Sequence, residues 1–306
     1  MKQVIEIEKV SDIHQIGGLS VPKHPLVSVV HNRDLKTVRD IQGIKVINHL
    51  YTIIFKSSAV CSSFSYGRNS YDYEDGTLVF TGPGQVMKFE NEVATVDEVD
   101  KDGWSLVFHP DIFRRSKLAD RMSKYTFFQY DSNEALHVSE QEKALLEDLL
   151  QKMIQEYGQA LDRHSQHLIT SYLELFLDYC LRFYDRQFYS RGNQNTDTIS
   201  KFERLLIEYY DSEQVIKDGI PSVEYCAKRL HRSPNYLSDL LRRETGKTTL
   251  EHIHYFLIER AKSTLLGSTD TISSIAYSLG FEYPQHFSNL FKSKTGISPK
   301  EYRNMN

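Results

Sequence analysis

The sequence is poor in cysteine and has no long hydrophobic run. Its 306 residues include three cysteines, Cys61, Cys180 and Cys226, which lie far apart, show no metal-binding spacing and are odd in number. Such cysteine usage is typical of a reducing compartment, so we expect a cytoplasmic protein. No apolar stretch approaches the roughly 18 residues that a membrane span needs, and the segment from Met1 has no apolar run of signal-peptide length. We therefore expect no membrane association.

Motifs of catalysis and metal binding are also missing. The sequence contains no nucleophile elbow and no glycine-rich phosphate loop. In its first part His24, His31 and His49 lie too far apart to form a metal-binding pair on a strand. His164 and His167 stand three residues apart and could share a metal ion, but no third ligand is evident. We predict a protein that is not an enzyme and that holds no metal or other cofactor.

Charge is distributed unevenly along the chain. The formal net charge is −4, but residues 198–306 carry 15 Lys and Arg against 13 Asp and Glu, whereas residues 1–197 carry 22 against 28. Within 221–249 the counts are six and three. The positive charge is therefore local, and a local basic patch suits a salt-dependent contact with nucleic acid.

One pattern occurs twice in the last third of the chain. Each copy spaces small and apolar residues as two short helices joined by a turn would. The copies match at an offset of 49 residues before the turn and 50 after it, at the pairs Ala227/Ala276, Leu230/Leu279, Leu237/Phe287, Leu240/Leu290, Leu241/Phe291 and Gly246/Gly296. Ser222, Ser233 and Thr271 stand where helix caps are needed. The sequence therefore predicts two helix-turn-helix motifs, at about 222–246 and 271–296, joined by a long helix at about 249–266.

The first 130 residues predict strands and turns instead. Short runs rich in β-branched and aromatic residues alternate with glycine and proline, at 25–30, 51–55, 77–80, 85–89 and 104–108. Such a series is typical of a β-sandwich or a small barrel.

From Ser139 the hydrophobic period becomes helical. We expect one helix from Ser139 to Gly158 and a second at 164–189. The residues expected to face inward from the second helix include Leu168, Ile169, Tyr172, Leu175, Phe176, Tyr179, Cys180 and Phe183. The polar stretch 190–197 contains no apolar residue and predicts an interdomain linker.

The repeat resembles the DNA-binding domain of the AraC/XylS family of bacterial transcription regulators. The resemblance covers about a third of the chain, and its matching positions include Ala227, Leu230, Tyr236, Arg242, Arg243, Arg260, Ala276, Leu279, Phe281, Phe291, Pro299 and Tyr302. It implies an α+β chain in which an N-terminal cupin-like β-barrel senses a small molecule and a helical pair mediates homodimerisation. It also implies double-stranded DNA and RNA polymerase as partners, and activation rather than repression.

The expected domains follow from the linker and the resemblance together. They are a sensor and dimerisation domain at 1–189, with its helical pair at about 139–189, the linker at 190–197 and the DNA-binding domain at 198–306.

The outward residues near the start of each recognition helix are candidates for reading bases. Asn and Gln can pair bidentately with adenine, Asp can accept from cytosine, and His can reach guanine. The predicted base-reading residues are Asn235, Ser238, Asp239, Gln285, His286 and Asn289. Contacts to phosphate, which position without specifying sequence, are predicted for Ser233, Tyr236, Arg242, Arg243 and Lys292. For Asn235, Ser238 and His286 the alternative is a solvated helix face.

A ligand site is less well defined by the sequence. Tyr66, Tyr71, Tyr73 and Trp104 could line a pocket for an effector, although core packing explains each of them as well. The leading hypothesis is a dimeric, effector-responsive transcription regulator. A constitutive regulator whose first domain serves only assembly is the alternative, and a metal-dependent cupin enzyme with a DNA-binding tail is less favoured.

Overall fold

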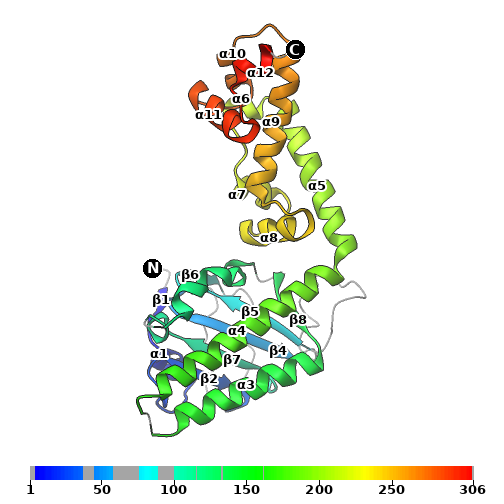
Figure 1. Ribbon diagram of the computed structural model, residues 1–306. Helices are drawn as coiled ribbons and strands as arrows, with labels where there is room; N and C mark the ends of the chain where they lie inside the picture. Colours follow the sequence, from blue (N-terminus) through cyan, green and yellow to red (C-terminus); the bar gives the residue numbers. More distant parts are fainter. Residues whose placement is uncertain are drawn as a thin grey trace. The chain divides into compact units, whose positions relative to one another are not determined.

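The computed structural model describes residues 4–36, 45–57, 76–88, 100–114, 116–131, 134–160 and 162–304. The chain divides into two compact units, Met1–Arg191 and Gly192–Asn306, and most of their elements are labelled in Figure 1. Within the described ranges, none of the helices combines the length and the apolar character that crossing a bilayer requires.

The strands of the first unit form two sheets (Figure 1). The larger sheet is antiparallel throughout, in the order β2 (Val27–His31), β7 (Trp104–Phe108), β4 (Tyr51–Ser57), β5 (Gly76–Thr81) and β8 (Leu136–Val138). In the smaller sheet the central strand is β3 (Lys45–Asn48), which pairs in parallel with β1 (Val4–Ile7) and antiparallel with β6 (Gln85–Lys88). No closed barrel is present among the described residues, so the structure shows the predicted β-sheet region without the predicted closure.

Short helices complete the first unit. They are α1 (Val10–Ile16), α2 (Leu118–Arg121) and the 3₁₀ turns η1 (Asn32–Asp34), η3 (Pro110–Ile112), η4 (Met122–Lys124) and η5 (Thr126–Gln129). Helix α1 packs with the two sheets, because its Val10 joins Ile7, Val46 and Val107 in one buried cluster.

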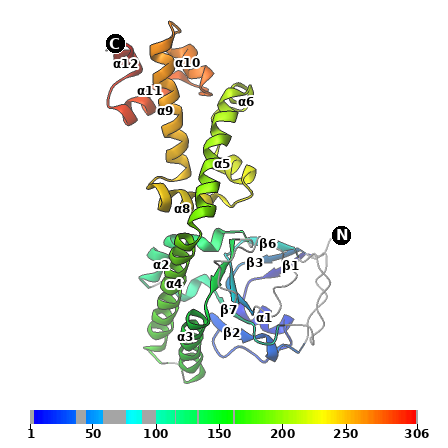
Figure 2. The same cartoon turned by 90° about the vertical axis from the view of Figure 1, so that its right-hand side faces the viewer.

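Two long helices cover one face of the larger sheet (Figure 2). They are α3 (Glu140–Gly158), which Ser139 and Glu142 cap reciprocally, and α4 (Ser165–Ser190). The layer between helices and sheet is aromatic. Phe55 stacks on Trp104 with ring centroids 5.4 Å apart, and Trp104 meets Phe176 of α4 edge-on at 6.2 Å. Each such pair adds about 0.5–1.5 kcal/mol beyond the burial of its area.

Trp104, one of the suggested pocket residues, is buried in the core. Its side chain is 1% exposed, and its indole N–H donates to the Glu147 carboxylate of α3 at 3.3 Å. The other three suggested pocket residues, Tyr66, Tyr71 and Tyr73, lie outside the described residues.

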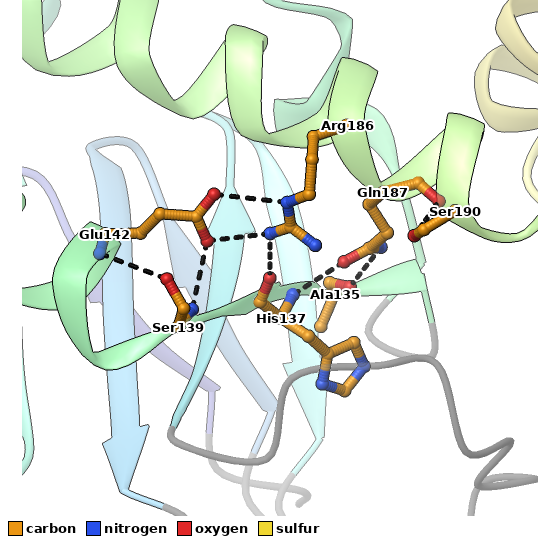
Figure 3. Close-up of polar contacts among 7 residues, drawn as sticks. All are labelled: Ala135, His137, Ser139, Glu142, Arg186, Gln187 and Ser190. Atoms are coloured by element: carbon orange, nitrogen blue, oxygen red, sulfur yellow. Dashed lines mark hydrogen bonds and ion pairs between the residues drawn. The ribbon is translucent and has the colours of Figure 1, made fainter.

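The C-terminal end of α4 is clamped to β8 and to the start of α3 (Figure 3). Arg186 donates to both carboxylate oxygens of Glu142, at 3.1 and 2.8 Å, and to the His137 carbonyl at 2.6 Å. The buried Gln187 accepts from the His137 N–H at 2.7 Å and donates to the Ala135 carbonyl at 3.1 Å. Gln187 therefore satisfies a donor and an acceptor on the outer edge of β8, as a neighbouring strand would.

The predicted linker is helical from Gly192 onward. Helix α5 spans Gly192–Asp211, and the division between the compact units falls at Arg191 and Gly192. Asn195 is 1% exposed and donates to the Glu244 carboxylate at 2.7 Å. The stretch predicted as an interdomain linker therefore contains the start of α5, and Asn195 within it forms a hydrogen bond inside the second unit.

The second unit is helical. After α5 come α6 (Gln214–Asp218), α7 (Val223–Arg229), α8 (Pro234–Thr245), α9 (Thr249–Gly267), α10 (Ile272–Ser278), α11 (Pro284–Thr295) and α12 (Pro299–Asn304). Two buried clusters share α9: Ile253 packs with residues of α7 and α8, whereas Leu257, Ala261 and Leu265 pack with residues of α10 and α11. A single helix thus supports both repeats.

Candidate nucleic-acid interface

Each repeat consists of a short helix, a left-handed turn residue and a longer helix. In the first repeat the turn residue is His231, at φ 54°, the one non-glycine residue with positive φ in the described ranges. In the second repeat it is Gly280, at φ 87°. Side chains are disfavoured in this conformation, and at Gly280 space is also lacking. A Cβ there would lie 2.8 Å from the carbonyl carbon of Gly219.

Helix α8 is the longer helix of the first repeat. Ser233 caps it by accepting from the Tyr236 N–H at 3.3 Å, Pro234 occupies its first position, and Gly246 ends it at φ 77°. One face buries three leucines, and the other carries the residues with predicted DNA contacts. Of these, Asn235, Ser238 and Asp239 are half-buried, and Arg242 and Arg243 are exposed.

Three of the predicted contact residues have structural roles in α8. The Ser238 hydroxyl donates to Thr249 Oγ1 at 3.1 Å, and Thr249, at the start of α9, is fully buried. Ser238 therefore ties α8 to α9. Ser233 and Tyr236 are each 3% exposed, so the protein itself covers their side chains. This burial argues against a phosphate contact through either of them.

Helix α11, the longer helix of the second repeat, presents a more open face. Its predicted contact residues Gln285, His286, Asn289 and Lys292 are all exposed. Gln285, Asn289 and Lys292 follow one side of the helix at intervals of four and three residues. Phe287 and Phe291, each 0% exposed, anchor the opposite side.

Tyr283, which directly precedes α11, is exposed beside the predicted contact residues but was not among the residues predicted to contact DNA. It is 48% exposed, and its ring centroid lies 5.5 Å from that of His286. Its position directly before Pro284, at the start of a helix, was the only signal in the sequence.

The likeness of the two repeats continues past the residues that match in sequence, to the start of the helix that follows each repeat. Thr248 and Glu251 form a capping box at α9, and Ser298 and Glu301 exchange the same two hydrogen bonds at α12. The Thr248 backbone N–H lowers the pKa of Glu251, and the Ser298 hydroxyl lowers that of Glu301. Both carboxylates thus stay ionised and hold the segment that follows each recognition helix.

The basic side chains gather around the first repeat. Lys228, Arg229, Arg242, Arg243 and Lys247 are exposed. The arrangement offers amide, imidazole and carboxylate groups for base edges and cations for phosphates. It offers no metal site, because the described part of the chain contains no group of three or more His, Cys, Asp and Glu that could hold an ion.

Comparison with known proteins supports this view of the second unit. Residues 226–305 match a family model described as a helix-turn-helix domain. The uncharacterized HTH-type transcriptional regulator YisR of Bacillus subtilis (strain 168) is 34% identical over 100 residues, which are 33% of this chain and 32% of that protein. The HTH-type transcriptional activator RhaS of Escherichia fergusonii is 32% identical over 112 residues, which are 37% of this chain and 38% of that protein.

A solved structure also matches about a third of the chain. The C-terminal domain of the two-component response regulator yesN from Fusobacterium nucleatum is 25% identical, with a TM-score of 0.31, and the match covers 35% of this chain and 98% of that one. The chain spans no more than 38% of the length of the first three curated relatives that it matches.

Proposed function

The C-terminal unit carries a helix-turn-helix domain of the AraC family, and from that premise we propose that the chain is a transcription regulator that binds two adjacent sites on double-stranded DNA. The observation that carries the proposal is the packing of α8 and α11 on one continuous helix, α9. Its 19 residues span about 28 Å at roughly 1.5 Å per residue. Successive major grooves on one side of a duplex lie roughly 34 Å apart, so a helix of this length suits two neighbouring grooves.

Within this proposal α11 contributes three base-reading residues and α8 contributes two. Gln285, His286 and Asn289 read base edges from α11, and Lys292 contacts phosphate. Asn235 and Asp239 read from α8, while Arg242 and Arg243 contact phosphate. Ser238 acts through its bond to Thr249 by positioning α8, and Ser233 and Tyr236 serve the fold of that helix.

We also propose that the chain is a homodimer that associates through α4. Leu168 and Leu175, expected to face inward, are 39% and 43% exposed, so that expectation is wrong for them. With the half-buried Tyr172 and Tyr179 they form a row along one side of α4 at helical spacing. An apolar row of this kind on a surface helix supports association with a second copy.

The finer parts of the proposal rest on the family resemblance. They are that the first unit is a cupin-like sensor, that it responds to a small molecule, and that the regulator activates transcription through RNA polymerase. A constitutive regulator whose first unit serves only assembly is the alternative, and ligand-induced stabilisation of the first unit would argue against it.

Selection of random duplex DNA by the full-length chain tests the proposal. We expect enrichment of paired boxes about one helical turn apart, and duplication of that unit if the chain is a dimer. Enrichment of one box alone would contradict the use of both recognition helices. If neither the full-length chain nor residues 198–306 enriches any sequence, the proposed function is wrong.

A further inference from the structure

The first unit contains a cavity of 430 Å³. The start of β4, the turn between β5 and β6, and the segment 122–129 surround it. Aromatic rings line part of it: Tyr51 meets Phe128 edge-on with centroids 4.8 Å apart. Tyr51 also stacks on Phe108, which is not among the lining residues, at 5.1 Å. Tyr125 and Met122 complete this side, and both present polarizable groups that pack well against a flat ligand.

The polar groups of the cavity are uncharged. No Asp, Glu, Lys, Arg or His is among its lining residues. Gln85 uses its Nε2 to donate to the Phe128 carbonyl at 2.9 Å, which leaves its Oε1 as an acceptor. The Tyr51 hydroxyl makes no hydrogen bond within the described ranges, and burial raises the pKa of Tyr51. Because the lining offers an ion no counter-charge in return for the hydration that it gives up on binding, the cavity suits a neutral molecule.

The same segment that lines the cavity also holds α4. Tyr125 donates its hydroxyl to Asp178 at 2.8 Å. Arg121, four residues earlier, donates to both oxygens of Asp178, at 2.8 and 3.0 Å, and also to Glu174. Tyr125 is 2% exposed, and burial together with the bond to Asp178 raises its pKa far above the ordinary value. The phenol therefore stays protonated and keeps its role as donor.

Asp178 and Glu174 flank the apolar row of α4. They alternate with Leu175 and Tyr179, two of the residues that we assign to the dimer contact. Tyr125 thus lines the cavity and also contacts α4 through its hydroxyl.

We propose that this cavity binds an uncharged aromatic molecule that carries a hydrogen-bond donor, as a phenol or an indole does, and that Tyr125 transmits its occupancy to α4. This inference rests on the proposed effector response and names the chemistry and the site of the effector. Tyr51 and Gln85 bind the donor group, and Phe128 and Met122 hold the ring.

Calorimetric titration of the full-length chain with 2-naphthol tests the site, with the anion 2-naphthoate as the charged control. We expect saturable binding of one 2-naphthol per chain and binding of 2-naphthoate at least about tenfold weaker, because desolvating the carboxylate is costly. Tyr51→Phe removes one neutral hydrogen bond and should weaken 2-naphthol binding about three- to tenfold. Absence of saturable 2-naphthol binding overturns the proposal.

A cavity-filling pair locates the binding. Met122→Trp should abolish 2-naphthol binding by occupying the cavity. Ser123→Trp adds the same side chain at the next, exposed position, which does not line the cavity, and should leave binding unchanged. Equal affinity in the two variants would place 2-naphthol elsewhere and overturn the assignment.

Transmission to α4 is measured by hydrogen exchange of residues 165–180 with and without 2-naphthol. We expect bound 2-naphthol to slow exchange there about twofold or more in the native chain. Tyr125→Phe keeps the ring but lacks the hydroxyl, so it should bind 2-naphthol and lose this protection. Asp178→Asn provides a second test at the other end of the bond. Protection that persists in both variants overturns the transmitting role of Tyr125.

These measurements are independent of DNA. If 2-naphthol binds as expected while random DNA selection enriches nothing, the site stands and the proposed regulator function fails. If DNA selection succeeds while 2-naphthol does not bind, the regulator stands and this inference fails.

Discussion

The two helix-turn-helix repeats of the second unit share their inward residues and differ in their turns and outward faces. Ala227 and Ala276 are both buried where the helices cross, but a histidine fills the left-handed turn of the first repeat and a glycine that of the second. Packing constrains the inward positions of both repeats, because each repeat must bury an apolar row of side chains against α9. The outward positions are free to diverge, so they are where function can differ between the repeats.

The turn residues offer the strongest contrast. Gly280→Ala places a Cβ at 2.8 Å from the Gly219 backbone at φ 87°, and we expect a loss of about 3 kcal/mol in the free energy of unfolding. His231→Gly at the equivalent position relieves a strained φ in an exposed residue and should change stability by less than about 1 kcal/mol. Urea unfolding of the full-length chains, followed by the helical circular dichroism signal, measures both. Equal effects would mean that the two turns are not constrained differently.

The open face of α11 gives the second contrast. Gln285→Ala should lower discrimination at one or two base pairs by about 1–3 kcal/mol and leave nonspecific affinity nearly intact. Asn235 is the half-buried residue of α8 at the position equivalent to Gln285. Asn235→Ala should lower discrimination at base pairs in the other half of the same DNA target. Binding of each variant to single-base variants of the selected sequence measures this discrimination. A uniform loss of affinity across all sequences would rule out base reading by Gln285.

The repeat made the second unit predictable from sequence. Its stripes, caps and stops predict the helices α7 to α11, because each repeat constrains the interpretation of the other, whereas α6 and α12 lie outside the repeat and were not predicted. In the first unit the five predicted runs, at 25–30, 51–55, 77–80, 85–89 and 104–108, correspond to β2, β4, β5, β6 and β7. Strands β1, β3 and β8 were missed because their three or four residues carry few alternations, whereas the equally short β6 follows a glycine-proline turn that marks its start.

The differences between the sequence-based expectations and the structure have one physical cause, which is the set of tertiary contacts that each side chain makes. Asn195 is polar and was assigned to a linker, but it is buried and donates to the Glu244 carboxylate, 49 positions away. For Trp104 the sequence left a pocket role and a core role open, and its ring contacts with Phe55 and Phe176 place it in the core. Leu168 has the hydropathy of a core residue but lies on the free side of α4. Local sequence specifies what a side chain can do, and the partner that the fold supplies determines which option is used.

Two serines at equivalent positions sharpen the comparison of the recognition helices. The Ser238 hydroxyl crosses from α8 to the buried Thr249, whereas the Ser288 hydroxyl donates to the Pro284 carbonyl within its own helix, at 3.1 Å. Ser238→Ala should therefore lower the free energy of unfolding by about 1 kcal/mol, because a buried acceptor loses its donor. Ser288→Ala removes only a local bond and should change stability by less than about 0.5 kcal/mol. A larger effect for Ser288→Ala would contradict the positioning role of Ser238.

The salt dependence of DNA binding tests the proposed phosphate contact of each repeat separately, and here we expect the smallest effects. Arg243→Ala and Lys292→Ala each remove one cation next to the duplex, so each should reduce the slope of log binding constant against log salt concentration by about one unit. Affinity should fall alike for all sequences, because phosphate contacts carry no sequence information. The double variant should lose about two units if both repeats contact the same duplex at once. A double variant no lower than either single variant would mean that only one repeat is docked at a time, and the two motifs would then act in turn rather than together.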